Sequence, residues 1–308
     1  MLAKFPQFGQ LEITDKQNIE NITKSFSSYS DFNFVSLYSW DTKGVSRISL
    51  LNDNLVIRFL DYITNEPFYT FIGKNEVAKT IETLFDLSEK EGLEPCLKLV
   101  PEETVKDNLV RLNNVYIISE DYDNFDYIYL FEKTVGLKGN IYKRERKLIN
   151  GFKRKYPYCQ TKEIDLGDRR VQEDFLELLK LWGKQKRKTK EELNNEFIAI
   201  KRLFEIAKIS NLVNLGFYIG ERLIGISINE SVNDEYVLGH FGKYDSNFQG
   251  IFQHLEYETA RVMLEKGYKF LNMEQDLGLQ DLKHSKKSWN PVFYLKKYTI
   301  RKKGILPS

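Results

Sequence analysis

The stretch LGFYIGERLIGISIN, from Leu215 to Asn229, decides the fold of the second half of this 308-residue chain. Two apolar runs, Leu215–Ile219 and Leu223–Asn229, flank the tripeptide Gly220-Glu221-Arg222. Two β-like runs separated by a short glycine-containing turn predict an antiparallel β-hairpin. The hairpin therefore begins a mostly antiparallel sheet, and the segments on both sides of it indicate what covers that sheet.

The segments around this hairpin alternate between helical and strand patterns. Apolar residues at helical spacing predict two helices before the hairpin and a longer helix after it. The expected elements besides the hairpin are helices around Phe175–Trp182 and Leu193–Phe204, the strand Tyr236–Tyr244, a helix from about Phe248 to Lys266, the strand Phe270–Met273, a short segment holding Asp281–Trp289 and a last strand Val292–Ile300. Two helices, hairpin, strand, helix and strand is the element order of the GNAT-type acyltransferase fold.

The first half shows the same pattern in a degenerate form. Its expected elements are a helix over Ile19–Tyr29, the strands Val45–Leu51, Asn54–Tyr62 and Phe68–Ile72, a helix over Ala78–Phe85, and the strands Leu97–Val100, Tyr116–Ser119 and Tyr127–Phe131. We therefore predict an α+β protein with two tandem GNAT-like domains, each a mixed, mostly antiparallel central sheet flanked by helices. The predicted parts are a degenerate N-terminal domain (1–135), a basic bridging helix that Pro157 ends (136–157) and a C-terminal domain that carries the site (158–308).

Charge is divided unequally between these halves. Residues 1–135 hold 13 Lys and Arg against 22 Asp and Glu, a net charge of −9. Residues 136–308 hold 33 against 22, a net charge of +11. A basic half joined to an acidic half indicates that one side of the protein meets a polyanion, although two ordinary surfaces would give the same count.

The basic residues gather in three stretches: Lys138–Lys155, Lys184–Lys190 and the segment from Lys283 onward. Clusters of this kind neutralise phosphates and dominate nucleic-acid affinity. Tyr142, Tyr156 and Trp289 lie among them and are expected to offer rings on which unpaired bases stack. An anionic membrane surface would attract the same stretches, and solvated surface charge would account for any single one.

Composition excludes several classes of protein. With 42% hydrophobic and 14% aromatic residues, and only 18 Gly and 7 Pro, the chain is neither collagen-like nor disordered. No apolar run approaches the ~20 residues that span a bilayer, and the N-terminus lacks the regions of a signal peptide. The two cysteines, Cys96 and Cys159, fit neither a disulfide framework nor a metal-site spacing, so we expect no metal. The sequence thus predicts a soluble, cytoplasmic protein.

Three separated segments carry a resemblance to a known family. They are Asn272-Met273-Glu274-Gln275-Asp276-Leu277-Gly278 with Lys286-Lys287-Ser288-Trp289-Asn290-Pro291, then Lys143-Arg144-Glu145-Arg146 with Ile149-Asn150-Gly151-Phe152, and Phe32–Trp40. The chain resembles the DUF2156 family, which is related to the C-terminal domain of phosphatidylglycerol lysyltransferase. The resemblance implies a tandem GNAT protein similar to the module that takes an amino acid from aminoacyl-tRNA. Glu145-Arg146 departs from the family, which more often has Asn soon after Lys-Arg, and this weakens any polar role assigned to this position.

Three residues near strand ends are candidates for catalysis. Glu274 and Asp276 follow the strand after the long helix, which in this fold ends beside the reaction centre. A carboxylate there can take the proton of an attacking amine or hydroxyl, or bind the cationic amine of a donor. His240 lies on a central strand and is expected to face the substrate cleft. The alternatives are a capping or turn role for the carboxylates and a hydrogen-bonded core position for His240.

Eight further residues are predicted to bind substrate: Lys143, Arg144, Lys243, Gly250, Gln275, Gly278, Lys283 and Lys286. Lys283 and Lys286 are three apart, so on a helix they would share a face and hold a phosphate, a carboxylate or an RNA 3′ end. Gly250 belongs to the turn where CoA-dependent GNAT enzymes bind pyrophosphate on backbone amides at a helix N-terminus. This turn offers one glycine where the CoA motif has two, and a tight turn into a core helix is the alternative.

These observations predict an acyl- or aminoacyltransferase that moves an amino acid from aminoacyl-tRNA to an unknown amine or hydroxyl acceptor, which is a small molecule, a peptide or a lipid. The basic half would dock the tRNA, and no cofactor is expected. One alternative is an acyl-CoA-dependent N-acyltransferase. The other is a non-catalytic module on a transferase fold that binds RNA or anionic lipid. The oligomeric state stays open.

Overall fold

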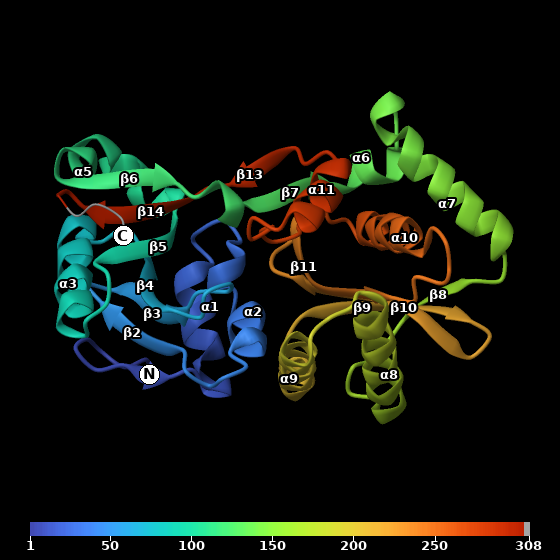
Figure 1. Cartoon of the computed structure of the whole chain (residues 1–308), viewed down its shortest axis with the longest axis horizontal. Coiled ribbons are helices and arrows are strands. Elements are labelled where there is room, and N and C mark those ends of the chain that lie inside the picture. The colour runs from blue at the N-terminus through green and yellow to red at the C-terminus, as the bar shows by residue number, and fades with distance from the viewer. Residues whose placement is uncertain (305–308) are drawn as a thin grey trace. The chain divides into compact units, whose positions relative to one another are not determined.

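The computed structural model describes residues 1–304, which form two compact units with one sheet each (Figure 1). The first unit contains Met1–Asp126, Gln275–Lys283 and the segment from Tyr294 onward. The second unit contains Tyr127–Glu274 and His284–Phe293. The chain therefore passes from one unit to the other several times.

The first sheet has the strand order β1-β2-β3-β4-β5-β14-β6. Its strands are β1 (Gly9–Gln10), β2 (Arg47–Leu51), β3 (Asn54–Leu60), β4 (Pro67–Ile72), β5 (Cys96–Pro101), β6 (Tyr116–Glu120) and β14 (Lys297–Lys302). The helices between these strands are α1 (Lys16–Thr23), α2 (Phe34–Trp40), α3 (Val77–Lys90), α4 (Glu102–Val105) and α5 (Leu109–Val115). β4 and β5 run parallel, and the other neighbouring strands are antiparallel.

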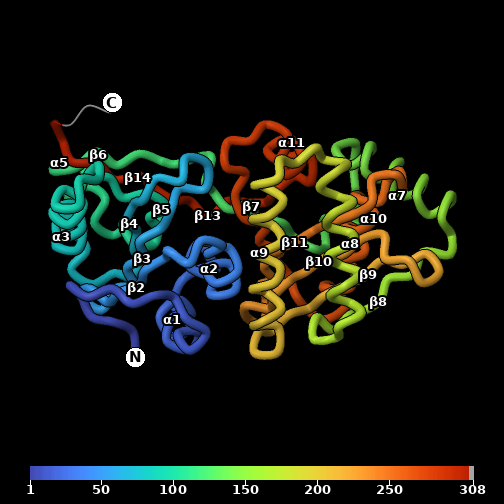
Figure 2. Tube along the Cα trace, turned by 60° about the horizontal axis from the view of Figure 1, so that its bottom comes forward, coloured from blue at the N-terminus to red at the C-terminus, as the bar shows by residue number. Residues whose placement is uncertain are grey.

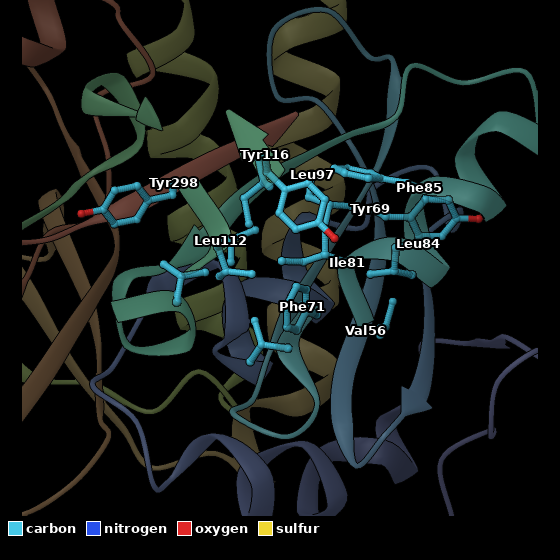
Figure 3. Close-up of a cluster of buried hydrophobic side chains, with 14 of the residues drawn as sticks. Val56, Tyr69, Phe71, Ile81, Leu84, Phe85, Leu97, Leu112, Tyr116 and Tyr298 are labelled. Carbon is cyan, nitrogen blue, oxygen red and sulfur yellow. The ribbon is translucent and has the colours of Figure 1, made fainter. Parts of the chain in front are cut away.

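The core of the first unit lies between this sheet and α3 (Figure 3). Ile81, Leu84 and Phe85 recur at helical spacing, so they line one face of α3, and all three are buried. They pack with Tyr69 and Phe71 of β4 in one apolar cluster. Burial of these large side chains is the main favourable term that holds the helix on the sheet.

The second sheet has the order β13-β7-β12-β11-β10-β9-β8. Its strands are β7 (Asp126–Leu130), β8 (Gln160–Glu163), β9 (Leu212–Ile219), β10 (Arg222–Ser231), β11 (Tyr236–Tyr244), β12 (Phe270–Asn272) and β13 (Phe293–Leu295). The remaining helices are α6 (Phe131–Gly136), α7 (Lys143–Lys155), α8 (Arg169–Gln185), α9 (Lys190–Ile206), α10 (Ile251–Glu265) and α11 (Gln280–Ser288). In the second unit, α8 and α9 lie side by side on one face of β9, β10 and β11, and α10 lies on the other (Figures 1 and 2).

The predicted fold class is confirmed: the chain is an α+β protein with two mixed seven-stranded sheets flanked by helices. Each sheet repeats the order hairpin, strand, helix and parallel strand, as β2-β3-β4-α3-β5 and as β9-β10-β11-α10-β12. No helix within residues 1–304 has the length and apolar character needed to cross a membrane.

Two strands lie in the sheet opposite to the one expected. We expected a strand near Tyr127–Phe131 to belong to the first half, but β7 pairs with β12 in the second sheet. We expected one last strand, Val292–Ile300, in the second half, but this segment holds two strands: β13 lies in the second sheet as expected, whereas β14 lies between β5 and β6 in the first sheet. An alternating apolar pattern shows that a segment is a strand without naming its partner, so the sequence did not indicate this exchange.

The basic helix also differs from its expected place. α7 runs from Lys143 to Lys155 and belongs to the second unit instead of bridging two domains. Ile149 and Phe152 are buried on it, and Phe152 stacks on His254 of α10 with a ring-centroid distance of 4.4 Å. The apolar face of α7 is therefore part of the core of the second unit, and its basic residues face outward.

β11 and β12 form a fork. They pair over three residues only, from Tyr236 opposite Phe270 to Leu238 opposite Asn272. β12 then ends while β11 continues to Tyr244. His240 is an extra residue in β11, because Ile228 of β10 lies opposite Phe241 while Asn229 lies opposite Gly239. Such a β-bulge bends a strand and turns a side chain away from strict alternation.

Candidate active site

Three side chains of the second unit meet at this fork. His240 Nε2 lies 3.2 Å from Glu230 Oε2 on β10, and His240 Nδ1 lies 3.8 Å from Glu274 Oε1 in the loop after β12. The His240 and Glu230 side chains are 1% and 5% exposed, whereas that of Glu274 is 22% exposed. Glu274 is therefore the member of the cluster that a substrate can reach.

The cluster determines the charge of His240. Burial alone would lower the pKa of this imidazole, but its contacts with Glu230 and Glu274 outweigh burial and raise the pKa to about 9. His240 is thus an imidazolium at neutral pH and not a free base. It can orient a carboxylate and stabilise negative charge, but it cannot accept a proton until it has given up its own.

Lys243 lies on the same strand as His240. Its ammonium lies 2.9 Å from Glu196 Oε2 on α9 and 3.9 Å from the centre of the Trp182 ring on α8. Burial lowers the pKa of Lys243, and Glu196 and Glu274 oppose this effect. Glu274 thus acts electrostatically on both His240 and Lys243, so the structure brings three predicted site residues together in one charged cluster.

The loop that carries Glu274 has an unusual backbone. Glu274 and Leu277 adopt left-handed conformations, with φ values of 57° and 56°. The buried side chain of Asn272 accepts a hydrogen bond of 2.7 Å from the Glu274 amide, which stabilises this turn. Strained backbone of this kind is often found where a functional side chain is held in a set direction.

Asp276 and Gly278 form a turn in the first unit, and Lys283 follows on α11. Asp276 is fully buried and accepts a hydrogen bond of 2.8 Å from the Gly278 amide, which is the turn role expected as the alternative to catalysis. Gly278 has a φ of 72°, and a Cβ at this position would come within 2.9 Å of Asp123 Oδ2. Lys283 donates to Asp123 Oδ1 over 2.9 Å. A catalytic role for Asp276 stays a prediction, whereas its hydrogen bond to the Gly278 amide is part of the turn.

Gln275 belongs to a buried polar network that the sequence did not predict. Its amide oxygen accepts a hydrogen bond of 3.2 Å from Lys297 of β14, and its amide nitrogen donates one of 3.2 Å to Asp31. Lys297 also donates to Asp126 over 2.6 Å and forms an ion pair with Asp31. The lysine and both aspartates are shielded from solvent, and burial raises the pKa of Asp31. No motif joins these residues, because they come from segments far apart in the chain.

The turn before α10 is already filled by the protein. Asp245 is fully buried and accepts a hydrogen bond of 3.0 Å from the Asn247 amide and one of 2.7 Å from Gln185. It also pairs with Arg222. Gly250 has a φ of 88°, and a Cβ there would meet the Leu148 carbonyl oxygen of α7 at 2.7 Å. An internal carboxylate and a neighbouring helix thus occupy the space beside this turn.

Lys286 and Glu256 influence each other electrostatically in the second unit. Lys286 is buried, and its ammonium donates to the Met273 carbonyl oxygen. Its own carbonyl accepts a hydrogen bond of 2.8 Å from the Tyr129 hydroxyl. Burial raises the pKa of half-buried Glu256 on α10 to about 7, with Lys286 opposing the shift. The sequence offers no signal for Glu256, which is one acidic residue among several on its helix.

The aromatic residues expected to stack on bases are core residues instead. Tyr142 and Trp289 are buried, and Tyr156 packs against Phe152 and Phe248. The expectation was wrong because these rings supply the apolar side of basic segments. The basic side chains themselves are outside, and Lys143 and Arg144 are exposed at the start of α7.

No group of three or more His, Cys, Asp and Glu side chains in residues 1–304 is arranged to hold a metal ion. The charged side chains at the fork instead form ion pairs with one another. The arrangement can therefore orient an exposed carboxylate next to two cations, which suits proton transfer and stabilisation of negative charge in acyl transfer.

Known proteins are similar to this chain in sequence and in fold. Residues 23–301 match the family model for the C-terminal part of phosphatidylglycerol lysyltransferase. A conserved protein of unknown function from Bacteroides thetaiotaomicron is 26% identical, with a TM-score of 0.82 over 96% of this chain and 99% of that one. The L-PGS structure from Bacillus licheniformis is 13% identical, with a TM-score of 0.62 over 99% of this chain and 95% of that one. An uncharacterized protein of Mycoplasmoides gallisepticum is 20% identical over 95% of this chain and 98% of its own length.

Proposed function

Because this chain belongs to the phosphatidylglycerol lysyltransferase C-terminal family, we propose that it is an aminoacyltransferase that takes an amino acid from aminoacyl-tRNA. The observation that carries the proposal is the cluster of Glu230, His240 and Glu274 at the fork between β11 and β12. A donor of this class works in the cytoplasm, and we propose that location for the protein. The acceptor is an amine or a hydroxyl.

In the proposed mechanism, Glu274 takes the proton of the attacking amine or hydroxyl as this group forms a bond to the ester carbonyl carbon. The bond from that carbon to the ribose oxygen of the tRNA then breaks, and Glu274 gives its proton to this oxygen. His240 holds one oxygen of this carboxylate, so the other is directed toward the substrate. Lys243 supplies positive charge for the oxyanion that forms on the ester carbonyl. The donor ester is already activated, so positioning and charge stabilisation are the main tasks that remain for the protein.

The filled turn before α10 supports aminoacyl-tRNA over acyl-CoA as the donor. A helix N-terminus binds pyrophosphate when its amides are open to an incoming anion. Here Asp245 accepts a hydrogen bond from the Asn247 amide and already supplies a negative charge in the turn. A pyrophosphate would have to displace this carboxylate and approach Gly250, which abuts α7. An acyl-CoA-dependent reaction is therefore the weaker candidate.

The exposed face of α7 supports docking of the tRNA. Lys143, Arg144 and Lys147 are exposed there, and their charges suit the phosphates of a duplex stem. Replacing all three by serine should weaken tRNA binding. It should also lower the slope of log affinity against log salt by about 0.9 for each phosphate that the variant no longer neutralises.

The proposal is tested by incubating the protein with a mixed pool of labelled aminoacyl-tRNAs and cell extract as acceptor. Loss of label from one amino acid would identify the donor. The Glu274→Gln variant should react about 100- to 10,000-fold more slowly, because it removes a general base. Glu221→Gln, at a highly exposed position paired with Arg170, is the matched control and should react at the wild-type rate.

Two results would contradict the proposal. Equal rates with wild type and Glu274→Gln would remove Glu274 from the mechanism. No loss of label from any aminoacyl-tRNA, together with salt-dependent tRNA binding, would instead support a non-catalytic RNA-binding module.

A further inference from the structure

The turn between α8 and α9 in the second unit carries a dense run of positive charge. Residues 184–192 hold five Lys and Arg against two Glu, a net charge of +3. Lys188 pairs with Glu192 over 2.7 Å. The other four cations are exposed and form no ion pair within residues 1–304: Lys184, Lys186, Arg187 and Lys190. The mechanism proposed above does not use these four residues.

The end of α8 has a strained backbone at one of these cations. The Lys188 amide donates to the Gly183 carbonyl oxygen over 2.9 Å, and the Arg187 amide donates to that of Lys184 over 3.2 Å. These two bonds form a Schellman motif, in which the left-handed residue is usually glycine. Arg187 occupies this position with a φ of 54°. An arginine therefore stands where the backbone favours a residue without a Cβ.

Two other helices of this chain end with the same motif and do use glycine. Gly92 after α3 has a φ of 71°, and Gly267 after α10 has a φ of 96°. Each is followed by the same pair of backbone hydrogen bonds. A Cβ costs stability in the left-handed conformation, and no ion pair of Arg187 within residues 1–304 offsets that cost. A ligand bound by its exposed guanidinium gives a reason for an arginine at this position.

Hydrogen bonds attach the turn to the end of β11, the strand that carries the candidate active site. The Gln185 amide nitrogen donates to buried Asp245 over 2.7 Å, and the Gln185 amide oxygen accepts a hydrogen bond of 2.8 Å from the Ser246 amide. The Lys186 ammonium lies 5.3 Å from the centre of the Tyr244 ring. The turn is thus held in a fixed place, with one of its cations over an aromatic ring.

The turn lies close to the charged residues at the fork. Burial is the main cause that lowers the pKa of Lys243, and the charge of Lys188 lowers it further. Tyr244 lies four residues beyond His240 on β11, which is about 13 Å at the usual rise of a strand. A phosphate bound at the turn and an ester bound at the fork would therefore be joined by a short stretch of single strand.

The surroundings of the turn favour a nucleic acid over a membrane. The nearby carboxylates of Glu196 and Asp245 already pair with Lys243 and Arg222, so the cations of the turn stay in excess. Surfaces that bind a bilayer add large apolar side chains to their cations. None of the exposed large apolar residues within residues 1–304 lies in residues 180–192. Cations beside an aromatic ring are instead typical of sites that bind a single strand.

We propose that the turn between α8 and α9 binds backbone phosphates in the unpaired 3′ segment of the tRNA donor, through Lys186 and Arg187. This assignment rests on the proposed aminoacyl-tRNA donor and names the part of it that the turn holds. The guanidinium of Arg187 suits a phosphate because it can donate two parallel hydrogen bonds. The exposed face of α7 is proposed for the duplex stem, so the turn adds a contact nearer the ester.

The test measures binding of a labelled single-stranded RNA that ends in 5′-ACCA-3′, by fluorescence anisotropy over a range of salt. One phosphate contact adds about 0.7 to the slope of log affinity against log salt. Lys186→Ala and Arg187→Gly should each remove that amount, which relative to 1 M salt is a loss of about eightfold at 50 mM and about threefold at 200 mM. Lys201→Ala removes an exposed charge about 16 Å beyond Lys190 along α9 and should bind like wild type.

Thermal unfolding gives an independent measurement for Arg187. Arg187→Gly removes the Cβ from a left-handed position, so it should raise the thermal midpoint while it weakens RNA binding. A lowered midpoint would show that the arginine stabilises the fold and would overturn its assignment as a ligand contact.

Three binding results also overturn the phosphate site. They are no binding of the RNA by wild type, equal affinities and slopes for wild type and both variants of the turn, and variants that lose binding to phosphatidylglycerol vesicles but keep binding to RNA. The last result would assign the turn to a membrane surface.

The transfer assay separates this site from the proposed function. Transfer by wild type that neither Lys186→Ala nor Arg187→Gly slows, at tRNA concentrations below saturation, refutes the phosphate site and leaves the function intact. RNA binding that depends on both residues, with no transfer by wild type, supports the phosphate site and refutes the transferase.

Discussion

Replacing Lys297 by methionine is expected to destabilise the first unit by about 3–5 kcal/mol at pH 7. The substitution removes the cation that pairs with both Asp31 and Asp126, and it leaves two buried carboxylates without their counter-ion. At 2.6 Å and an effective dielectric constant near 20, the attraction between Lys297 and Asp126 is about 6 kcal/mol. The variant no longer has to bury an ammonium, which offsets part of this loss.

Urea-dependent hydrogen exchange measures this effect within the first unit, on peptides from β14 and from Ser30–Phe32. The loss should shrink as the pH falls from 7 to 5. Burial raises the pKa of Asp31 and Lys297 opposes this shift, so without Lys297 the Asp31 pKa in the folded variant lies still further above its value in the unfolded chain. The folded variant therefore gains stability by binding a proton as the pH falls. Lys302→Met removes an exposed lysine of the same strand and should change stability by about 0.5 kcal/mol or less. A loss below about 1 kcal/mol at pH 7, or an equal loss at both pH values, would refute this reasoning.

Three further predictions concern the second unit. The pKa of His240 is raised to about 9, so the stability that its proton contributes is fully present below pH 6.5. Roughly 3 kcal/mol of the free energy of unfolding should be lost as the pH rises toward 9 and above. In the His240→Gln variant, urea unfolding should show no such loss over this pH range. Burial lowers the pKa of His254 to about 4, so wild type should lose stability as the pH falls from 6.5 to 4, and His254→Phe should abolish this acid sensitivity in the same titration. Gly250→Ala should cost about 1–3 kcal/mol, because its φ is positive and its Cβ meets the Leu148 carbonyl oxygen. Thermal unfolding should show a much smaller effect for Gly242→Ala, where the Cβ meets nothing within 4 Å.

The sequence predicted the fold because its hydrophobic periods are local. The hairpin around Gly220-Glu221-Arg222 and the amphipathic face of α10 follow from patterns within one element. The partner of a strand depends on the rest of the chain. β7 and β14 carry the same alternating pattern in either sheet, so their exchange became visible only in three dimensions.

The candidate site was predictable only where it lies in a motif. Glu274 was found through its place after a strand end, and His240 through its place on a central strand. Their mutual contact depends on the bulge in β11, which changes the alternation on which the prediction relied. Glu230 and Glu196 were missed because they carry no motif, and their role arises from two further elements packed against β11.

In the turn before α10, a glycine at the position of the CoA-binding motif does not by itself indicate that the turn binds CoA. The single glycine of this turn left CoA binding open as a prediction. The number of glycines could not decide it, because the turn still has a left-handed glycine, Gly250, at the helix N-terminus. The answer depends on Asp245, whose side chain accepts a hydrogen bond from Asn247 in the turn ahead of the helix, and on α7, which abuts Gly250. A buried carboxylate and the abutting helix α7 both oppose an incoming anion at this turn, which is why we propose a donor that does not use it.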